Sequence, residues 1–405
     1  MARYLIVLLI LRAVSAQSFI PATPGTPPRL LPEDAAVLES SETRADLGCT
    51  VKPTVPRLGF DMRFHSGYQV SVPLAELIGS GNRLTTLFRV TPEEPRGDPA
   101  YFVQYWGVPA IPAETKGLAD LRGGIALGPG KYRVEWLLRD QSNRVCASHW
   151  QIAVNPRGRD KQVPFENIMG TMQSEEVDDF MEEMPVTKQK GEGLKVLVLF
   201  HAAARSLSSA SLDRTEMQAL LAVLRRMAQE PRIESYSLVA FNLDQAAVIY
   251  RGEDLPQIDF PGLGEALKQV KLGTVDIQKL KDRDGGAEFL SGLLSGELSS
   301  RRPDALIFVG SRSADSPPLG HSLKDMAEPG LPVFYVDYTP DAVKDPWRDT
   351  IGSLVKLWKG SEYLITQPSD LAAAWNDIIA RLTVRSMARP DPNTTPALTG
   401  ATFQK

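Results

Sequence analysis

The sequence predicts two folded parts of different class: an N-terminal all-β sandwich and a C-terminal doubly wound α/β domain. Short aromatic and β-branched segments between glycines and prolines, such as Tyr132–Trp136, indicate the first part. Alternating strands and helices after Leu194 indicate the second, and this alternation begins with the apolar run Lys195–Phe200, which is typical of a strand buried on both faces. A length of 405 residues is enough for two domains, each with its own core.

The composition excludes several classes of protein. A hydrophobic fraction of 43% with 23% charged residues is ordinary for a soluble globular chain, and argues against wholesale disorder and against a multi-span membrane protein. A net charge of -4 argues against a dedicated nucleic-acid binder. Two cysteines are too few for a zinc ribbon or an iron–sulfur site, and we expect no cofactor.

Residues 1–16 have the pattern of a signal peptide. Arg3 precedes the apolar run Tyr4–Leu11, and Val14 and Ala16 are small residues at the positions that signal peptidase accepts. The run is too short to span a bilayer, and no second long apolar run follows. The alternative is a buried N-terminal strand. We expect cleavage after Ala16 and a secreted or periplasmic protein without a transmembrane segment.

Export places the two cysteines in an oxidising compartment, in which an isolated pair usually forms a bridge. We therefore expect a disulfide between Cys49 and Cys146. A loop of roughly 100 residues closed in this way would contribute about 4–5 kcal/mol of stability on the chain-entropy model. Two buried free thiols are the alternative.

The N-terminal half divides into a leader and a sandwich. Residues 17–45 are rich in proline and small polar residues, and we expect a flexible leader. Residues 46–155 are expected to form the sandwich, which resembles the immunoglobulin or fibronectin type, with Cys49 on its opening strand and Cys146 on its closing strand. Its predicted strands include Phe60–Phe64, Tyr68–Val72, Leu84–Val90, Tyr101–Trp106, Lys131–Asp140 and Arg144–Val154.

Residues 156–193, with the acidic run Glu175–Glu183, are predicted to be a linker, and the acidic run is expected to be a solvated face. Residues 194–385 are predicted to be the α/β domain, and residues 386–405 a disordered tail. The predicted elements of the α/β domain are strands at Lys195–Phe200, Ser235–Asn242, Ala246–Tyr250, Ala305–Gly310, Pro332–Asp337 and Glu362–Ile365, and helices at Leu212–Gln229, Gly286–Ser299, Pro346–Lys359 and Asp370–Arg381.

In order and spacing, residues 194–382 resemble the von Willebrand factor type A domain. The stretches Lys195–Phe200, Ser237–Asn242, Arg302–Gly310 and Ile351–Ile365 carry the resemblance, together with Gly285-Gly286-Ala287 before the central helix. The resemblance implies a Rossmann-type α/β fold. It covers a little under half of the chain.

This family usually holds a divalent cation through Asp, Ser and Thr oxygens at the strand ends. On this sequence the resemblance places the five metal-site positions at His201, Ala203, Arg205, Ala287 and about Ser311. No carboxylate stands at any of them, and an arginine would oppose a cation. The resemblance therefore implies a domain that has lost its metal site.

The same strand ends supply a candidate partner-binding rim. Its residues are His201, Arg205, Ser206, Ser208, Ser311, Arg312 and Ser313. Arg205 and Arg312 together would receive an acidic side chain of a partner in place of the metal. The alternative is that these are loop residues that cap helices and meet solvent.

We expect an exported, non-enzymatic interaction or adhesion protein with an unidentified protein partner. The alternative is a hydrolase or metal-dependent enzyme at the same strand ends, with His201, His321, Asp315 and Asp337 gathered there. No Gly-x-Ser-x-Gly motif, phosphate-binding loop or His-x-x-x-His spacing supports the enzyme.

Overall fold

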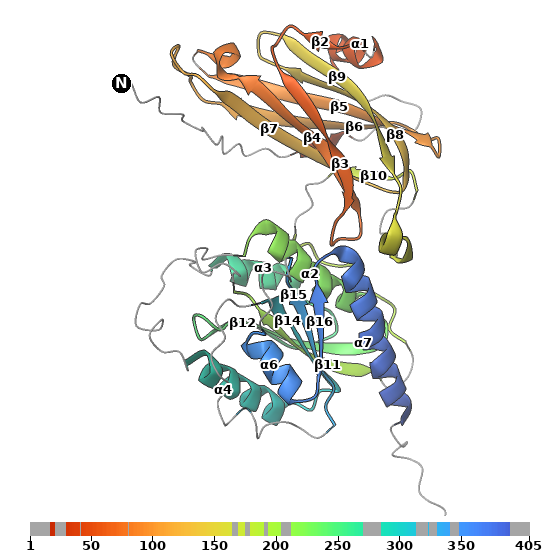
Figure 1. The fold of residues 1–405 in the computed structure, drawn as a ribbon, viewed down its shortest axis with the longest axis vertical. Coiled ribbons are helices and arrows are strands. Elements are labelled where there is room, and N and C mark those ends of the chain that lie inside the picture. The colour runs from red at the N-terminus through yellow and green to blue at the C-terminus, as the bar shows by residue number, and fades with distance from the viewer. Residues whose placement is uncertain are drawn as a thin grey trace, which may run out of the picture. The chain divides into compact units, whose positions relative to one another are not determined.

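The structure is a computed structural model that describes residues 17–20, 30–40, 42–79, 81–163, 169–174, 179–189, 193–203, 212–269, 285–312, 323, 330–340 and 348–388. The chain divides into two compact units, Met1–Asp179 and Phe180–Lys405, coloured red to yellow and green to blue in Figure 1. The predicted signal peptide, residues 1–16, lies outside the described residues. Among the helices that the structure describes, none has the length and apolar composition needed to cross a membrane.

The first unit is built from two antiparallel sheets (Figure 1). One has the order β1-β6-β5-β8-β9-β2 and the other β10-β7-β4-β3. Their bounds are β1 (Gln17–Ile20), β2 (Arg44–Ala45), β3 (Thr50–Leu58), β4 (Phe64–Pro73), β5 (Asn82–Glu94), β6 (Ala100–Val108), β7 (Leu118–Leu127), β8 (Gly130–Arg139), β9 (Val145–Val154) and β10 (Met172–Ser174), with short 3₁₀ helices at Leu74–Leu77 and Gly158–Gln162.

Aromatic side chains of both sheets fill the core between them. The ring of Tyr68 on β4 lies 5.2 Å from that of Trp136 and 5.7 Å from that of Phe88, measured between centroids. The hydroxyl of Tyr68 donates a hydrogen bond to Gln104 Oε1 at 3.1 Å. The buried polar end of this tyrosine is therefore satisfied within the core.

Part of the predicted flexible leader is regular structure. Residues Gln17–Ile20 form β1, and Pro32–Ser40 form helix α1. Val37 and Leu38 of α1 are buried in a cluster with Leu87 of β5 and with three residues of β8 and β9, namely Leu137, Val145 and Ala147. The prediction treated proline as a sign of flexibility, but Pro32 stands at the first position of the helix, where its missing N–H costs nothing.

Strand β3 is an edge strand with an unusual composition. It pairs with β4 alone in the described sheet and contains Pro53 and Pro56. All nine of its residues are exposed or half-buried, and 75% of Val55 is exposed. Proline is tolerated here because an edge strand can turn a position without an N–H toward solvent.

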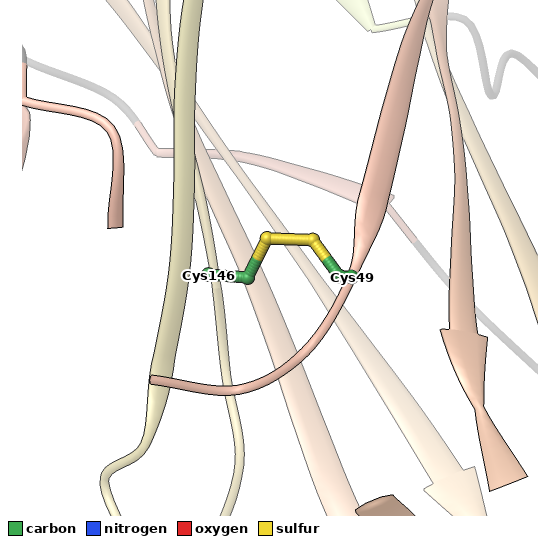
Figure 2. The surroundings of a disulfide bond; sticks show 2 residues. All are labelled: Cys49 and Cys146. Atoms are coloured by element: carbon green, nitrogen blue, oxygen red, sulfur yellow. A yellow bond between two sulfur atoms is a disulfide. The ribbon is translucent and has the colours of Figure 1, made fainter. Parts of the chain in front are cut away.

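The predicted disulfide is present in the first unit (Figure 2). Cys49 precedes β3, and Cys146 lies on β9 and is almost fully buried. Their Cα atoms are 6.2 Å apart, and 97 positions separate them in the sequence. The bond therefore ties the segment between β2 and β3 to strand β9.

The second unit contains one six-stranded sheet with the order β13-β12-β11-β14-β15-β16 (Figure 1). The buried residues of α4 and α6 form one apolar cluster with residues of β11, β12, β14 and β15. The bounds are β11 (Leu194–His201), α2 (Arg214–Ala228), β12 (Ile233–Asn242), β13 (Ala247–Leu255), α3 (Phe260–Gln269), α4 (Gly285–Ser300), β14 (Ala305–Ser311), β15 (Val333–Tyr338), α6 (Thr350–Leu357), β16 (Ser361–Ile365) and α7 (Pro368–Ala388).

These findings correct the predicted fold class of a sandwich followed by a doubly wound α/β domain. The described chain is mainly β, with its strands in three sheets and most of its helices late in the chain. The third sheet is mixed, because β13 runs antiparallel to β12. Only residues 243–246 connect these strands, which is too short for a crossover to a parallel strand. An apolar run indicates a buried strand but not whether that strand is parallel or antiparallel to its neighbour. The predicted doubly wound fold class was wrong for this reason.

Part of the predicted linker is regular structure of the first unit, since Met172–Ser174 form β10, and the described residues from Phe180 onward pack on the second unit. Phe180 lies against Gly264 of α3, where an added Cβ would come within 2.5 Å of the phenyl ring. Glu183 pairs with Arg225 at 2.9 Å, and the ammonium of Lys188 lies 5.1 Å from the ring centre of Tyr236. Residues 175–178 of the acidic run and residues 389–405 of the predicted tail lie outside the described residues, and residues 386–388 belong to α7.

Candidate functional site

The carboxyl ends of three parallel strands meet at one edge of the third sheet. His201 at the end of β11 pairs in register with Gly310 of β14, and Gly310 pairs with Asp337 of β15. Ser311 and Arg312 follow directly after Gly310. We call the four side chains His201, Ser311, Arg312 and Asp337 the strand-end cluster.

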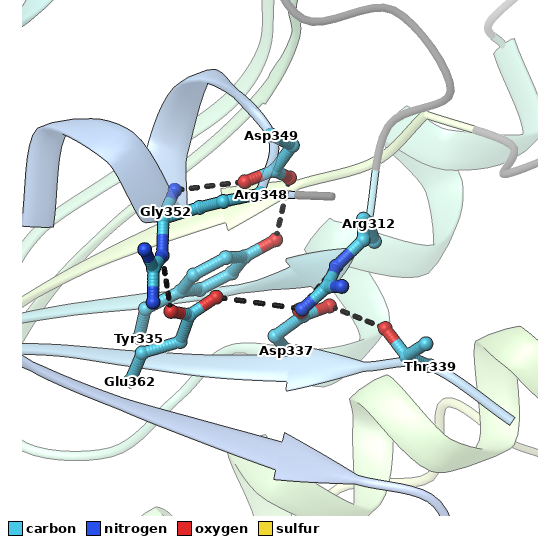
Figure 3. A network of polar contacts seen from close by, with 8 residues as sticks. All are labelled: Arg312, Tyr335, Asp337, Thr339, Arg348, Asp349, Gly352 and Glu362. Carbon is cyan, nitrogen blue, oxygen red and sulfur yellow. Dashed lines mark hydrogen bonds and ion pairs between the residues drawn. The ribbon is translucent and has the colours of Figure 1, made fainter. Parts of the chain in front are cut away.

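Arg312 and Asp337 form a buried ion pair within this cluster (Figure 3). Nε and Nη2 of Arg312 donate hydrogen bonds to Asp337 Oδ2 at 2.8 and 2.5 Å. The other carboxylate oxygen accepts a hydrogen bond from the Thr339 hydroxyl at 2.9 Å. Asp337 is 0% exposed and Arg312 is 5% exposed, so both charges are withdrawn from solvent.

Further polar groups extend this pair toward β16 and α6 (Figure 3). Glu362 lies 3.5 Å from Arg312 Nη2 and accepts a hydrogen bond from Arg348 Nε at 2.7 Å. Asp349 accepts hydrogen bonds from the backbone N–H of Gly352 at 2.7 Å and from the Tyr335 hydroxyl at 3.0 Å. The first of these caps the N-terminus of α6. The network therefore joins three strands to one helix.

The network determines the protonation of Asp337 and Tyr335. Burial raises the pKa of Asp337 to about 7; the nearby charge of Asp349 adds to this increase, whereas Arg312 opposes it. Burial also raises the pKa of Tyr335 well above its ordinary value, so its hydroxyl remains a hydrogen-bond donor. Arg312 stays protonated at every ordinary pH. A permanent positive charge therefore lies at this sheet edge.

His201 is fully buried and neutral. Its ring lies 5.3 Å from that of Phe241, and its Nε2 accepts a hydrogen bond from the backbone N–H of Leu243 at 3.4 Å. Burial lowers the pKa of His201 to about 4, and the backbone of Ser311 partly opposes this change. His201 does not face a partner, because none of its surface is exposed.

Ser311 is also buried. Its hydroxyl has no hydrogen-bond partner among the residues that the structure describes. Ala203 and Ala287, at two positions of the expected metal site, are buried apolar residues. Within the described chain, no three His, Cys, Asp or Glu side chains gather in a way that could hold a metal ion.

The predicted rim is therefore only partly described. The structure brings together His201, Ser311 and Arg312, whereas Arg205, Ser206, Ser208 and Ser313 lie outside the described residues, as do Asp315 and His321. Arg312 was predicted to receive an acidic side chain of a partner. In the structure its guanidinium is buried and already paired with Asp337 of the same chain. The physical reason is that an arginine at a buried strand end must be neutralised within the protein.

Sequence reasoning did not assign Asp349, Glu362 or Tyr335 to the site. Asp349 carries a usable signal, because an aspartate directly before an apolar helical period is a typical N-cap. Glu362 and Tyr335 lie inside strands, and the sequence contains nothing that indicates their contacts. They reach the network only because β14, β15 and β16 are neighbours in the sheet.

No family model matches this chain, and no curated protein matches it. Solved structures give only distant likenesses. The PilB minor pilin from Streptococcus sanguinis is 11% identical, with 88% of this chain and 96% of that chain covered and a TM-score of 0.28. An azoreductase from Bacillus anthracis is 12% identical over 48% of this chain and 98% of its own, with a TM-score of 0.20. A glycosyl hydrolase family 2 member from Bacteroides cellulosilyticus is 11% identical over 80% of this chain and 45% of its own, with a TM-score of 0.19. At such low TM-scores none of them supports a conclusion about this chain.

Proposed function

We propose that this chain is a non-enzymatic protein-interaction protein of an exported compartment. The observation that carries the proposal is the ion pair of Arg312 with Asp337 at the strand ends. Both groups are buried and satisfied by each other and by Thr339, so neither is free to act on a substrate. The neighbouring His201 is neutral and buried, which leaves no exposed acid or base among the described residues of the strand-end cluster.

The resemblance to the von Willebrand factor type A family is part of this proposal. In that family a bound cation supplies the positive charge at the strand ends, and here the guanidinium of Arg312 lies at those ends with Asp337 as its counter-ion. Such a chain would bind partners without metal. The disulfide supports the exported location, because such bonds persist in oxidising compartments.

The proposal is tested with the full chain. The purified, oxidised protein is cross-linked to proteins of the exported fraction of its source, and each captured candidate is then purified and titrated against the chain by calorimetry. We expect saturable binding to at least one candidate, unchanged when chelator is added. The proposal fails if no purified candidate binds, or if chelator abolishes the binding.

One observation favours a hydrolase as the second candidate. Ser311 Oγ is buried without a described hydrogen-bond partner, and it follows the residue that pairs in register with His201. Nucleophilic catalysis uses a serine and a histidine within hydrogen-bond reach of each other. Here Ser311 Oγ and His201 Nδ1 each have no described hydrogen-bond partner, so that contact would have to form when substrate binds. A screen of ester and amide substrates with the wild-type chain, Ser311→Ala and His201→Ala decides this question. Turnover lost in both variants would support the hydrolase, and absence of turnover in the wild type would exclude it for the substrates screened.

A further inference from the structure

A groove of about 450 Å³ lies between the end of α2 and the side of α7. It belongs to the second unit alone and is separate from the strand-end cluster. Its lining combines the buried side chains of Trp375 and Ile379 on α7 with the turn at Pro231 and a rim that includes Arg226 and Asn376. A concave surface of this size with a partly apolar floor and a few polar groups has the general character of a ligand site.

Two residues that line this groove, Arg226 and Trp375, carry hydrogen-bond donors without an acceptor among the described residues. The side chain of Arg226 makes no hydrogen bond or ion pair with any other described residue, although Arg225 beside it pairs with Glu183. Trp375 is only 3% exposed, and its indole N–H likewise has no hydrogen bond to a described residue. A tryptophan N–H and a guanidinium can only donate. A bound group that supplies an acceptor, preferably an anionic one, would therefore satisfy both donors.

Glu230 is the carboxylate among the described residues that line the groove, and it does not supply this acceptor. Glu230 is held by Arg232, with Nε to Oε1 at 2.6 Å and Nη2 to Oε2 at 3.1 Å. Arg232 also donates from Nη1 to the Thr383 hydroxyl at 3.0 Å. The charge of Glu230 is thus neutralised at one end of the groove, whereas Arg226 has no counter-charge among the described residues.

We infer that the α2–α7 groove binds an acidic peptide segment of the partner protein. A carboxylate of that segment accepts hydrogen bonds from Arg226 and Trp375, and an adjacent apolar side chain lies on Ile379 and Pro231. This inference rests on the proposed interaction function and gives it a site. It places recognition in the groove, because the arginine of the strand-end cluster already has its own carboxylate.

The test follows the indole resonances of the full chain labelled with ¹⁵N at tryptophan, with the Trp375 signal assigned from Trp375→Phe. The probes are the peptides Ac-Leu-Glu-Glu-Leu-NH₂ and its neutral match Ac-Leu-Gln-Gln-Leu-NH₂. We expect the Trp375 signal to shift and saturate with the glutamate peptide and to stay unmoved by the glutamine peptide. Arg226→Ala should weaken the binding by about tenfold, because a charge-assisted hydrogen bond is lost.

Lys356→Ala is the matched control, because it removes an exposed cation on α6 outside the groove and should leave the affinity unchanged. Arg226→Ala should keep the wild-type unfolding midpoint, since Arg226 has no described partner to lose. The inference is overturned if the Trp375 signal does not move, if both peptides move it equally, or if Arg226→Ala binds like the wild type. Tighter binding of the same peptide with phosphoserines in place of the glutamates would overturn the carboxylate assignment.

The failure of this inference can be told apart from the failure of the proposed function. A purified partner that binds the wild type and Arg226→Ala equally would disprove the groove as the binding site but would still support the interaction function. If the groove binds the glutamate peptide but no purified partner binds the chain, the proposed function is disproved and the binding site is supported.

Discussion

Arg312 and Asp337 neutralise each other across the ends of neighbouring parallel strands, with Arg312 Nη2 2.5 Å from Asp337 Oδ2. Both side chains are buried, and Thr339 and Glu362 complete their hydrogen bonds. Removing two charges from water costs several kcal/mol per ion, so the pair persists only because each group supplies the other's counter-charge. It is a structural element at the place where the sequence predicts a binding rim.

A double-mutant cycle measures this dependence. Arg312→Met leaves Asp337 buried without its counter-ion and should cost about 3–5 kcal/mol in the free energy of unfolding. Asp337→Leu leaves Arg312 with only the longer contact to Glu362 and should cost somewhat less. The double variant should cost clearly less than the sum, because no buried charge remains. Urea unfolding of the full chain gives all four values. Additive losses would contradict the interpretation that each charge depends on the other.

The stability of the second unit should depend on the protonation of His201. The pKa of this imidazole is about 4 in the folded chain and ordinarily 6.5, so between these values the unfolded chain binds more protons. Stability is therefore lost as the pH falls from about 6.5 to 4, by up to about 3 kcal/mol. His201→Leu should remove this slope from a series of unfolding curves across that pH range.

That measurement needs one control variant and one correction for a second titrating group. His149→Gln alters an exposed histidine of the first unit and should leave the slope in place. Asp337 acts with the opposite sign, because its folded pKa of about 7 exceeds the ordinary 3.8 and its contribution is lost as the pH rises through 7. The dependence of the wild-type unfolding free energy on pH contains the contributions of both His201 and Asp337. The difference between the wild type and His201→Leu isolates the contribution of His201. An unchanged slope in His201→Leu would count against a buried neutral histidine.

Loss of the disulfide should destabilise the first unit alone. With 97 positions between Cys49 and Cys146, the chain-entropy model gives a loss of about 4–5 kcal/mol for Cys49→Ser with Cys146→Ser. Hydrogen exchange resolved by peptide should show faster opening in β8 and β9 and unchanged rates in β11 and β14. Equal acceleration in both units would mean that they do not unfold separately.

Truncation of a buried residue tests whether α1 is part of the first unit. Leu38→Ala removes apolar contacts with Leu87 and Leu137 and should lower the free energy of unfolding by about 2–4 kcal/mol. Glu39→Ala changes the neighbouring exposed position and should have little effect. Chemical denaturation of both variants provides the comparison. A leader without packed structure would tolerate the two changes equally.

The sequence predicts local elements better than their partners. The predicted strand Lys195–Phe200 lies within β11, and the predicted helix Leu212–Gln229 contains α2, where Asp213 and Glu216 form a capping box. Phe60–Phe64 was expected to be a strand, but its first four residues form a turn in which Met62 has a φ of 59°. Aromatic residues favour strands, and their composition alone does not reveal a reversal of the chain.

The candidate site was less predictable for a related reason. His201, Ser311 and Arg312 follow strands, and strand ends are readable as the limits of apolar runs. The pairing of Arg312 with Asp337 depends on the order of β14 and β15 in the sheet and on the depth at which both lie. A local sequence pattern gives neither the burial of a residue nor the order of the strands. An arginine in a buried structural ion pair therefore cannot be distinguished by sequence from an arginine that binds a partner.

The prolines of β3 bear on how molecules of this protein meet one another. An open sheet edge is a template on which a strand from a second molecule can be added, and such additions lead to aggregates. Pro53 and Pro56 of β3 have no backbone N–H, and prolines in an edge strand reduce its capacity to pair with a foreign strand. Addition of a strand from a second molecule is therefore disfavoured at the β3 edge.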